Sequence, residues 1–198
     1  MIFVFGGLEV RLVPITPLHY PLVYSLSKLD KRLSLPGLVV GSVILDIEVL
    51  LLWIFFSDLP DHQFLHSLIG AVTIGTLLAV IVTRFLYAPI ISTLFGVDRE
   101  RLNKVSGLSK TLVVSCLIGV LSHLLLDYPM HWFNPILWPW VDPFDVVGPL
   151  VLFFAPFGSI SGIAFRMANV LTNVIMFVWW VLILRKNWGK DLWGKYWV

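Results

Sequence analysis

The sequence predicts an all-α protein: a polytopic transmembrane helical bundle with about four spans, a shorter N-terminal helix and a re-entrant or interfacial segment. Of the 198 residues, 58% are hydrophobic and 13% are charged, whereas soluble domains have about 45–50% apolar and about 25% charged residues. The mean hydropathy is +0.90. The apolar residues gather in runs of about 20, which is enough to cross the roughly 30 Å hydrocarbon core of a bilayer as helices.

Four apolar runs are predicted to form the spans. The first begins near Pro36, which suits the first turn of a helix, and it ends before an acidic stretch. The second is longer than one span requires, and Pro89 is expected to kink or end it. The four runs cover residues 35–56, 64–95, 110–128 and 161–184.

The remaining stretches are predicted to be short or irregular. Residues 16–32 favour a helix whose end is too polar to span fully, and residues 1–13 favour an extended segment. Residues 129–160 contain six of the twelve prolines, which favours an irregular loop with a re-entrant or interfacial piece at 148–158. Because no repeat or linker is present, we expect one domain over 1–198.

The basic residues predict how the spans are oriented. Eleven of the fourteen Lys and Arg residues lie in 28–32, 99–110 and 185–195, which share one side if the helices alternate. Residues 57–65 and 129–160 contain neither Lys nor Arg. Because Lys-rich and Arg-rich loops stay in the cytoplasm, we expect a multi-pass protein of the cell membrane with its basic loops and C-terminus cytoplasmic. The N-terminus lacks the basic region of a secretory signal, so the spans are expected to direct insertion.

Ionisable residues inside or beside the predicted spans carry the chemistry, because a charge at mid-helix costs about 2.5–3.5 kcal/mol on insertion scales. His123 and Asp127 are four residues apart and share a helix face, while Asp46 and His66 come from two other helices. This mixture of imidazoles and carboxylates suits a divalent metal, most simply zinc, although a hydrogen-bonded His/Asp pair is the plainer alternative. We predict one or two ions held by these four residues, with His19 contributing to the second.

Other polar residues admit more than one interpretation. Glu48 could serve as a general base, support the ligands or join helices by hydrogen bonds. His62 and His131 fall in loops, where an interfacial position is more frequent, and His131 is an optional ligand. Arg166 either hydrogen-bonds between helices or receives a phosphate group. Cys116 is the single cysteine, which excludes a disulfide framework and a multi-thiolate metal site.

Four segments together resemble a known family. They are "TPLHYP" (16–21), "GSVILDIE" (41–48), "HSLIGA" (66–71) and "LSHLLLDYPMHWFNPILWPW" (121–140). In this order they resemble the membrane-bound metal-dependent hydrolases of the YdjM-like kind, LexA-binding and inner-membrane-associated, and their archaeal branch. The resemblance implies an α-helical bundle with a metal site whose ligand order is similar to that of zinc-dependent phospholipase C.

The likeness to phospholipase C maps five residues onto its ligand series: His19, Asp46, His66, His123 and Asp127. The soluble enzymes add further histidines and a His-x3-Glu pair downstream, whereas this chain has no histidine after position 131. The resemblance therefore implies one or two ions rather than a cluster of three. Many family members also carry an "HRG" segment whose arginine is missing here, so the substrate contacts are expected to differ.

These residues predict a metal-dependent hydrolase, a phosphoesterase that acts on a lipid or lipid-linked substrate at the extracytoplasmic side. Asp46 and Glu48 are the candidate catalytic residues, and Arg166 is the candidate phosphate contact. The expected partners are membrane lipids and the phosphoester substrate, with no nucleic acid and no obligate protein partner. Two other classes stay open: a proton or cation transporter or channel that uses intramembrane Asp, Glu and His, and an inactive or structural protein with a metal site.

Overall fold

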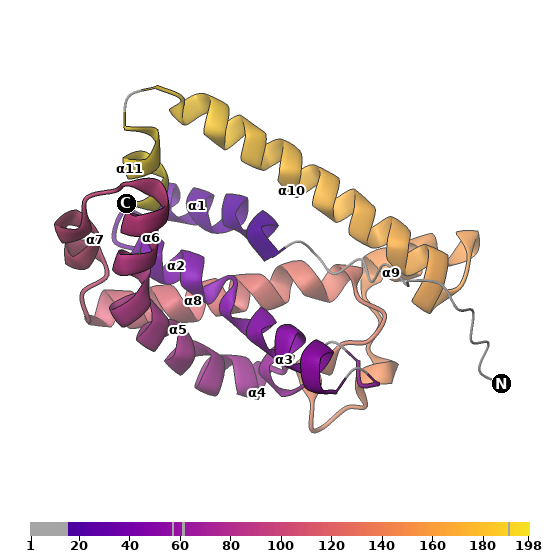
Figure 1. Cartoon of the computed structure of the whole chain (residues 1–198). Helices are drawn as coiled ribbons and strands as arrows, with labels where there is room; N and C mark the ends of the chain where they lie inside the picture. Colours follow the sequence, from indigo (N-terminus) through magenta and orange to yellow (C-terminus); the bar gives the residue numbers. More distant parts are fainter. Residues whose placement is uncertain (1–15, 57, 61, 190) are drawn as a thin grey trace.

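A computed structural model describes residues 16–56, 58–60, 62–189 and 191–198 of the chain (Figure 1). Within these residues every regular element is a helix, and no β-strand forms. The predicted all-α bundle is therefore confirmed. The predicted extended segment 1–13 lies outside the described residues.

The α-helices follow one another through the described part of the chain. They are α1 (Tyr20–Leu29), α2 (Leu35–Gly41), α3 (Ile47–Phe55), α4 (Leu68–Gly70), α5 (Thr76–Val82), α6 (Ala88–Phe95), α7 (Arg99–Val105), α8 (Lys110–Asp127), α9 (Pro149–Phe154), α10 (Phe165–Asn187) and α11 (Leu192–Trp197). Tighter 3₁₀ turns include η1 (Thr16–His19), η2 (Ile44–Asp46), η3 (Phe64–His66) and η6 (Tyr128–Met130), and wider π-helical turns include η4 (Ala71–Gly75), η5 (Thr83–Tyr87) and η10 (Ile160–Ala164).

Four helical stretches are long and apolar enough to cross a membrane, in agreement with the four predicted spans. Their outward faces expose large apolar side chains, for example Leu77 on α5, Val114 on α8 and Val178 on α10. Water does not favour so much exposed apolar surface, whereas lipid does, so this is the pattern of an integral membrane protein. The stretches are Leu35–Phe55, Leu68–Phe95, Lys110–Met130 and Ile160–Asn187.

The first stretch is not the continuous helix that the sequence predicts. α2 ends at Gly41, and the 3₁₀ turn η2 intervenes before α3 begins. At this break the backbone N–H of Asp46 donates to the carbonyl of Val43 instead of that of Ser42. The Ser42 carbonyl is consequently left without a helical partner in the interior of the bundle.

The second stretch continues past Pro89 to Phe95 as α6. The π-helical turn η5 directly precedes α6. Proline has no N–H and its ring crowds the carbonyl four residues earlier, and a wider turn accommodates both effects. Pro89 thus does not end the span, and the distortion expected from it takes the form of this turn.

The loop predicted over 129–160 is indeed irregular. It consists of short 3₁₀ turns and the six-residue helix α9, which begins at Pro149 within the segment expected to be re-entrant or interfacial. Asn169 of α10 joins this region to the bundle, because its side-chain amide donates to the carbonyl of Met130 at 3.0 Å. This hydrogen bond fixes the start of the loop, just after α8, to the fourth span.

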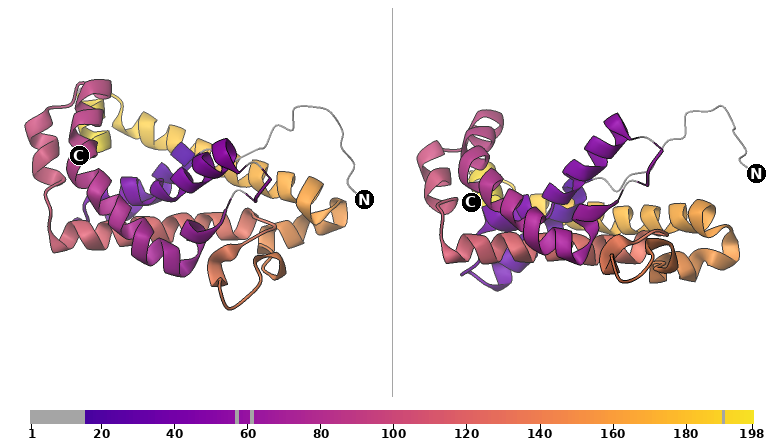
Figure 2. Two further views of the ribbon diagram at one scale, coloured as in Figure 1. Left: turned by 60° about the horizontal axis from the view of Figure 1, so that its bottom comes forward. Right: turned by 90° about the horizontal axis from the view of Figure 1, so that it is seen from below.

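The basic residues gather at one end of the elongated bundle (Figures 1 and 2). α1 and α10 finish there with Lys28 and with Arg185 and Lys186, and α7 and α11 lie there with Lys104 and Lys195. Because α1 has ten residues, it rises about 15 Å from this end, half the thickness of a bilayer core. Its N-terminal end, preceded by His19, is therefore deep inside the bundle.

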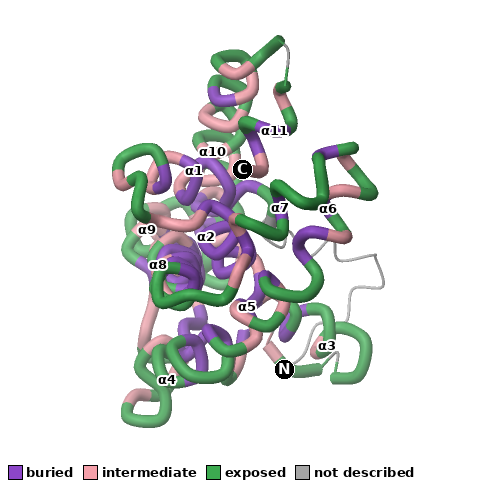
Figure 3. The backbone as a smooth tube through the Cα atoms, turned by 90° about the vertical axis from the view of Figure 1, so that its left-hand side faces the viewer, coloured by how far each residue is buried: buried purple, intermediate pink, exposed green. Residues whose placement is uncertain are grey.

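A close helix contact lies between α8 and α2, whose residues are all buried (Figure 3). A Cβ placed on Gly41 would be 2.4 Å from the carbonyl oxygen of Cys116, and one on Gly119 would be 2.4 Å from that of Leu38. Small residues at such crossings let the backbones of membrane helices approach closely. Both positions must therefore be glycine for α2 and α8 to lie this close together.

We expect Gly119→Ala to destabilise the protein by about 1–3 kcal/mol, because the new methyl group meets backbone atoms that cannot move aside without separating the helices. Thermal unfolding in detergent measures the effect. Gly107→Ala is the matched control, since its added Cβ meets no neighbour closer than 3.6 Å. Equal midpoints for the two variants would show that the contact tolerates a methyl group.

Candidate metal centre

The bundle brings all five histidines of the chain together in its interior. Each is at most 7% exposed, although they come from five different places in the fold. Two acidic residues, Asp46 and Asp127, lie among them. The histidines are His19 at the end of η1, His62 before η3, His66 at the end of η3, His123 in the last turns of α8 and His131 after η6.

Asp46, His66, His123 and Asp127 form a first set of possible ligands, whose nearest ligand atoms all lie within 4.8 Å of one another. The Nε2 atom of His123 is 3.0 Å from Oδ2 of Asp127 and 3.5 Å from Oδ1 of Asp46. The Nε2 atom of His66 is 3.6 Å from the same oxygen of Asp46. The sequence prediction that these four residues meet is confirmed.

The other ring nitrogens hold these imidazoles in place. Nδ1 of His123 and Nδ1 of His19 lie 2.9 and 3.0 Å from the free carbonyl oxygen of Ser42. Nδ1 of His66 lies 2.9 Å from the Glu48 carboxylate. A carbonyl or carboxylate oxygen can only accept, so each Nδ1 must donate and carry the proton. In the neutral ring, Nε2 then keeps its lone pair, which is how proteins prepare histidine for a metal.

In the neutral rings these lone pairs face one another and the oxygens of Asp127. Nε2 of His66 and Nε2 of His123 are 3.3 Å apart, and Nε2 of His19 is 3.3 Å from Oδ1 of Asp127. Nε2 of His19 and both carboxylate oxygens of Asp127 are buried without a hydrogen-bond partner in the described part of the chain. Buried polar atoms are rarely left in this state. A divalent cation among them removes the repulsion, so the residues present fit a metal ion.

His62, Asp127 and His131 form a second set, with ligand atoms again within 4.8 Å of one another. Nε2 of His62 is 3.7 Å from Oδ2 of Asp127, and the rings of His62 and His131 are 4.4 Å apart. Burial, together with the imidazoles of His66 and His131, lowers the pKa of His62 to about 3, and burial also lowers the pKa of His131. Both rings are therefore neutral at pH 7.

The sequence interpretation of His62 and His131 as interfacial loop residues is wrong, because both rings are buried in the cluster. The burial of these two side chains could not be predicted from the sequence, because loop residues follow no helical period. A spacing signal was present nevertheless. His62 precedes His66 by four residues, and Asp127 precedes His131 by four, which repeats the spacing of His123 and Asp127.

His19 belongs to neither set, but it contacts both residues on which the sets depend. Its ring centroid is 4.3 Å from that of His123, and its Nε2 atom faces Asp127. The structure therefore places His19 beside the ligand groups, and its role as a ligand of a second ion stays a prediction.

Glu48 points toward the ligands and is fully engaged. Its carboxylate accepts hydrogen bonds from the backbone N–H groups of Gln63 and Leu65 at 3.0 and 2.9 Å, in addition to its bond with His66. It thereby anchors the segment that carries His66 to the first turn of α3. Of the interpretations left open for Glu48, these contacts match support of a ligand.

Arg166 is the candidate residue that lies apart from the cluster. Its side chain is exposed at the start of α10, and it makes no hydrogen bond or ion pair with other described residues. Its neighbour Phe165 packs against His131, with ring centroids 5.7 Å apart. Arg166 is therefore at the same end of the bundle as the cluster without touching it.

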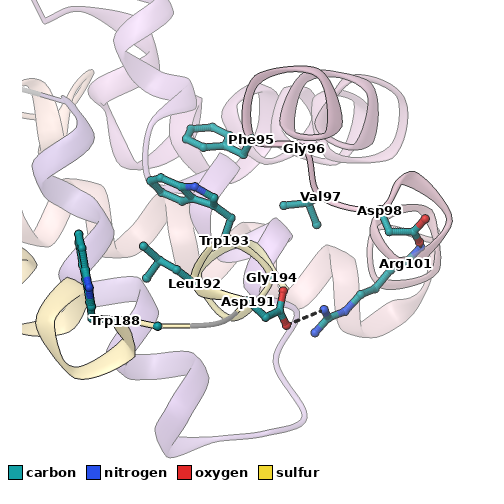
Figure 4. A pocket seen from close by; sticks show the side chains of 11 residues that line it. Phe95, Gly96, Val97, Asp98, Arg101, Trp188, Asp191, Leu192, Trp193 and Gly194 are labelled. Atoms are coloured by element: carbon teal, nitrogen blue, oxygen red, sulfur yellow. Dashed lines mark hydrogen bonds and ion pairs between the residues drawn. The ribbon is translucent and has the colours of Figure 1, made fainter.

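A cavity of about 550 Å³ lies elsewhere, at the basic end of the bundle (Figure 4). Phe95, Trp188 and Trp193 line it, together with the ion pair between Arg101 and Asp191, whose charged atoms are 3.2 Å apart. None of its lining residues belongs to the histidine cluster. The cluster, and not this cavity, is therefore the candidate site.

Comparison with known families finds a match over residues 13–134 to a model described as a domain of unknown function, DUF4184. The match covers more than half of the chain and includes every histidine and both acidic residues of the cluster. No curated protein and no solved structure matches the chain.

We expect Glu48→Gln to lower the affinity for zinc by about 10–100-fold, because the amide is a weaker acceptor for the His66 ring and for two backbone N–H groups. Competition with a chelator of known affinity measures this change. Glu100→Gln, at an exposed position on α7, is the control. An unchanged affinity in Glu48→Gln would contradict the supporting role of Glu48.

Proposed function

We propose that this chain, which belongs to the DUF4184 family, is a metal-dependent hydrolase of the membrane. One observation carries the proposal: imidazole nitrogens and carboxylate oxygens converge at 3.0–3.6 Å in a buried place, where Nε2 of His19 and both oxygens of Asp127 have no hydrogen-bond partner among the described residues. Keeping such groups inside an apolar bundle is costly, so they are retained for chemistry rather than for stability.

Asp46, His66, His123 and Asp127 would hold the ion. Zinc suits this mixture of nitrogen and oxygen ligands. When bound, it supplies a Lewis acid that polarises a phosphoryl oxygen and brings the pKa of water near 7. The resemblance to membrane-bound hydrolases of the YdjM-like kind supports the same reaction class.

The chain's own residues would divide the remaining work. The Asp46 side chain is 13% exposed, more than the other three ligands, so a substrate reaches it most readily. We assign it the role of general base. In phosphoester hydrolysis the water oxygen bonds to phosphorus while the bond from phosphorus to the ester oxygen breaks. Asp46 takes the proton of the water and returns it to the departing alkoxide. Glu48 keeps His66 oriented and does not react.

The location of the centre supports a lipid or lipid-linked phosphoester as substrate. The cluster is enclosed by the four apolar stretches, whose outer faces suit acyl chains. Arg166, exposed near the same end, is the proposed first contact for a phosphate group, since a guanidinium binds phosphate through paired hydrogen bonds.

The distribution of charge supports a cytoplasmic basic end and a centre nearer the extracytoplasmic surface. Cys116 is buried, so an added surface cysteine can be labelled selectively. We expect a membrane-impermeant maleimide to label Asp145→Cys in intact cells and Lys104→Cys only after permeabilisation. Both positions are exposed and lie outside the long helices. The reverse pattern would invert the proposed orientation.

Hydrolysis can be tested with purified protein in vesicles that contain phosphatidic acid, phosphatidylglycerol or a polyprenyl phosphate, by measuring release of phosphate or of the phosphorylated headgroup. We expect turnover that a chelator abolishes and zinc restores. We expect His123→Ala and Asp127→Ala to lower the turnover rate more than the loss of a supporting residue does. Loss of a supporting residue costs about 10–100-fold.

Asp145→Asn, which alters an exposed carboxylate, is the control for this assay. Turnover that is absent, or that survives in both ligand variants, would reject the hydrolase. Ion or proton flux in the same vesicles without hydrolysis would favour the transporter class instead.

A further inference from the structure

We infer that His62, His131 and Asp127 form a second divalent-cation site beside the first, so that Asp127 bridges two ions. The inference rests on the proposed metal centre, because the two sites share Asp127. It assigns a role to two histidines whose loop positions alone suggested none.

The carboxylate of Asp127 is placed to bridge. Its oxygens face three imidazoles from different elements: Oδ1 is 3.3 Å from His19, while Oδ2 is 3.0 Å from His123 and 3.7 Å from His62. Both oxygens are buried and accept no hydrogen bond within the described residues. One ion in the first site does not use all the lone pairs of the Asp127 carboxylate. A second ion on the His62 side would bind the remaining ones.

The segment after α8 is built to present His131. Nδ1 of His131 lies 2.9 Å from the backbone carbonyl oxygen of Asp127, so it must donate, and Nε2 keeps its lone pair as in the first site. The carbonyl of His131 accepts from the backbone N–H of Gly148 at 2.8 Å and from the side chain of Asn134 at 2.9 Å. A loop that held an interfacial histidine would not need this anchoring.

Gly148 makes the anchoring possible. A Cβ at this position would be 2.4 Å from the backbone oxygens of Tyr128 and Pro129, so only glycine allows the returning loop to approach so closely. His62 then closes the site from the opposite segment, with its ring 4.1 Å from His66 and 4.4 Å from His131. Chain segments about 70 residues apart thus hold the two imidazoles next to each other and to the Asp127 carboxylate.

Two ions about 3.5–4 Å apart stabilise both the attacking and the leaving oxygen of an in-line displacement at phosphorus. A carboxylate that lies between imidazoles on both sides suits that arrangement. The second site therefore supports the phosphoester substrate class proposed above.

Cobalt titration of detergent-purified, chelator-treated protein tests the inference, with visible absorption reporting occupancy and elemental analysis counting the ions. We expect two cobalt ions per chain in the wild type and in Asp145→Asn, but one in His62→Ala and in His131→Ala. His131→Gln and His62→Gln keep side-chain volume and guard against a simple failure to fold, which thermal unfolding of each variant monitors.

The outcomes separate the two proposals. One ion in the wild type, lost in His123→Ala and unaffected in the His62 and His131 variants, would overturn the second site while leaving the first intact. Two ions in folded His62 and His131 variants would overturn it as well. Two ions in the wild type and one in both variants, without turnover on any phosphoester, would support the second site while rejecting the hydrolase.

Discussion

The backbone carbonyl of Ser42, which has no partner within its own helix, is the feature on which the centre depends. A backbone group without a partner inside a bilayer costs several kcal/mol, so a helix break at this depth requires a substitute donor. His19 and His123 supply it from elements 23 and 81 residues away. The same two hydrogen bonds set the tautomer of both rings and direct their Nε2 atoms inward. The break and the histidine cluster therefore stabilise each other. The carbonyl needs the imidazole donors, and the imidazoles need the carbonyl as an acceptor, since the apolar residues around them offer neither.

Helix packing determines whether that carbonyl is within reach. Gly41 immediately precedes Ser42, and Gly119 lies one turn before His123 on the same face of α8. Because neither glycine carries a side chain, α2 and α8 approach until backbone meets backbone, which brings His123 into hydrogen-bonding distance of Ser42. A close crossing of two helices thus fixes the geometry of the ligands, with no ligand residue at the crossing itself.

Much of this arrangement could be predicted from the sequence. Runs of apolar residues indicated the four long helices, and costly ionisable residues indicated Asp46, His66, His123 and Asp127, because both signals depend on composition and spacing. The break at Ser42 could not be predicted, since the residues on either side of Ser42, from Leu35 to Leu45, are apolar and the interruption depends on donors far away in the chain. His62 and His131 were misread for a related reason: a loop has no period from which burial can be inferred, and only tertiary hydrogen bonds at Gly148 and Asn134 turn His131 inward.

The gathering of every histidine in one cluster has a spectroscopic consequence. In most proteins the imidazole resonances of a site must be separated from those of unrelated surface residues. Here a sample labelled with ¹⁵N only in histidine contains five rings, all within or beside the ligand sets, so each ring-nitrogen signal reports tautomer, protonation or coordination at the centre. The histidine ¹⁵N signals therefore contain no background from unrelated residues, and they report ion binding whether or not a substrate is known.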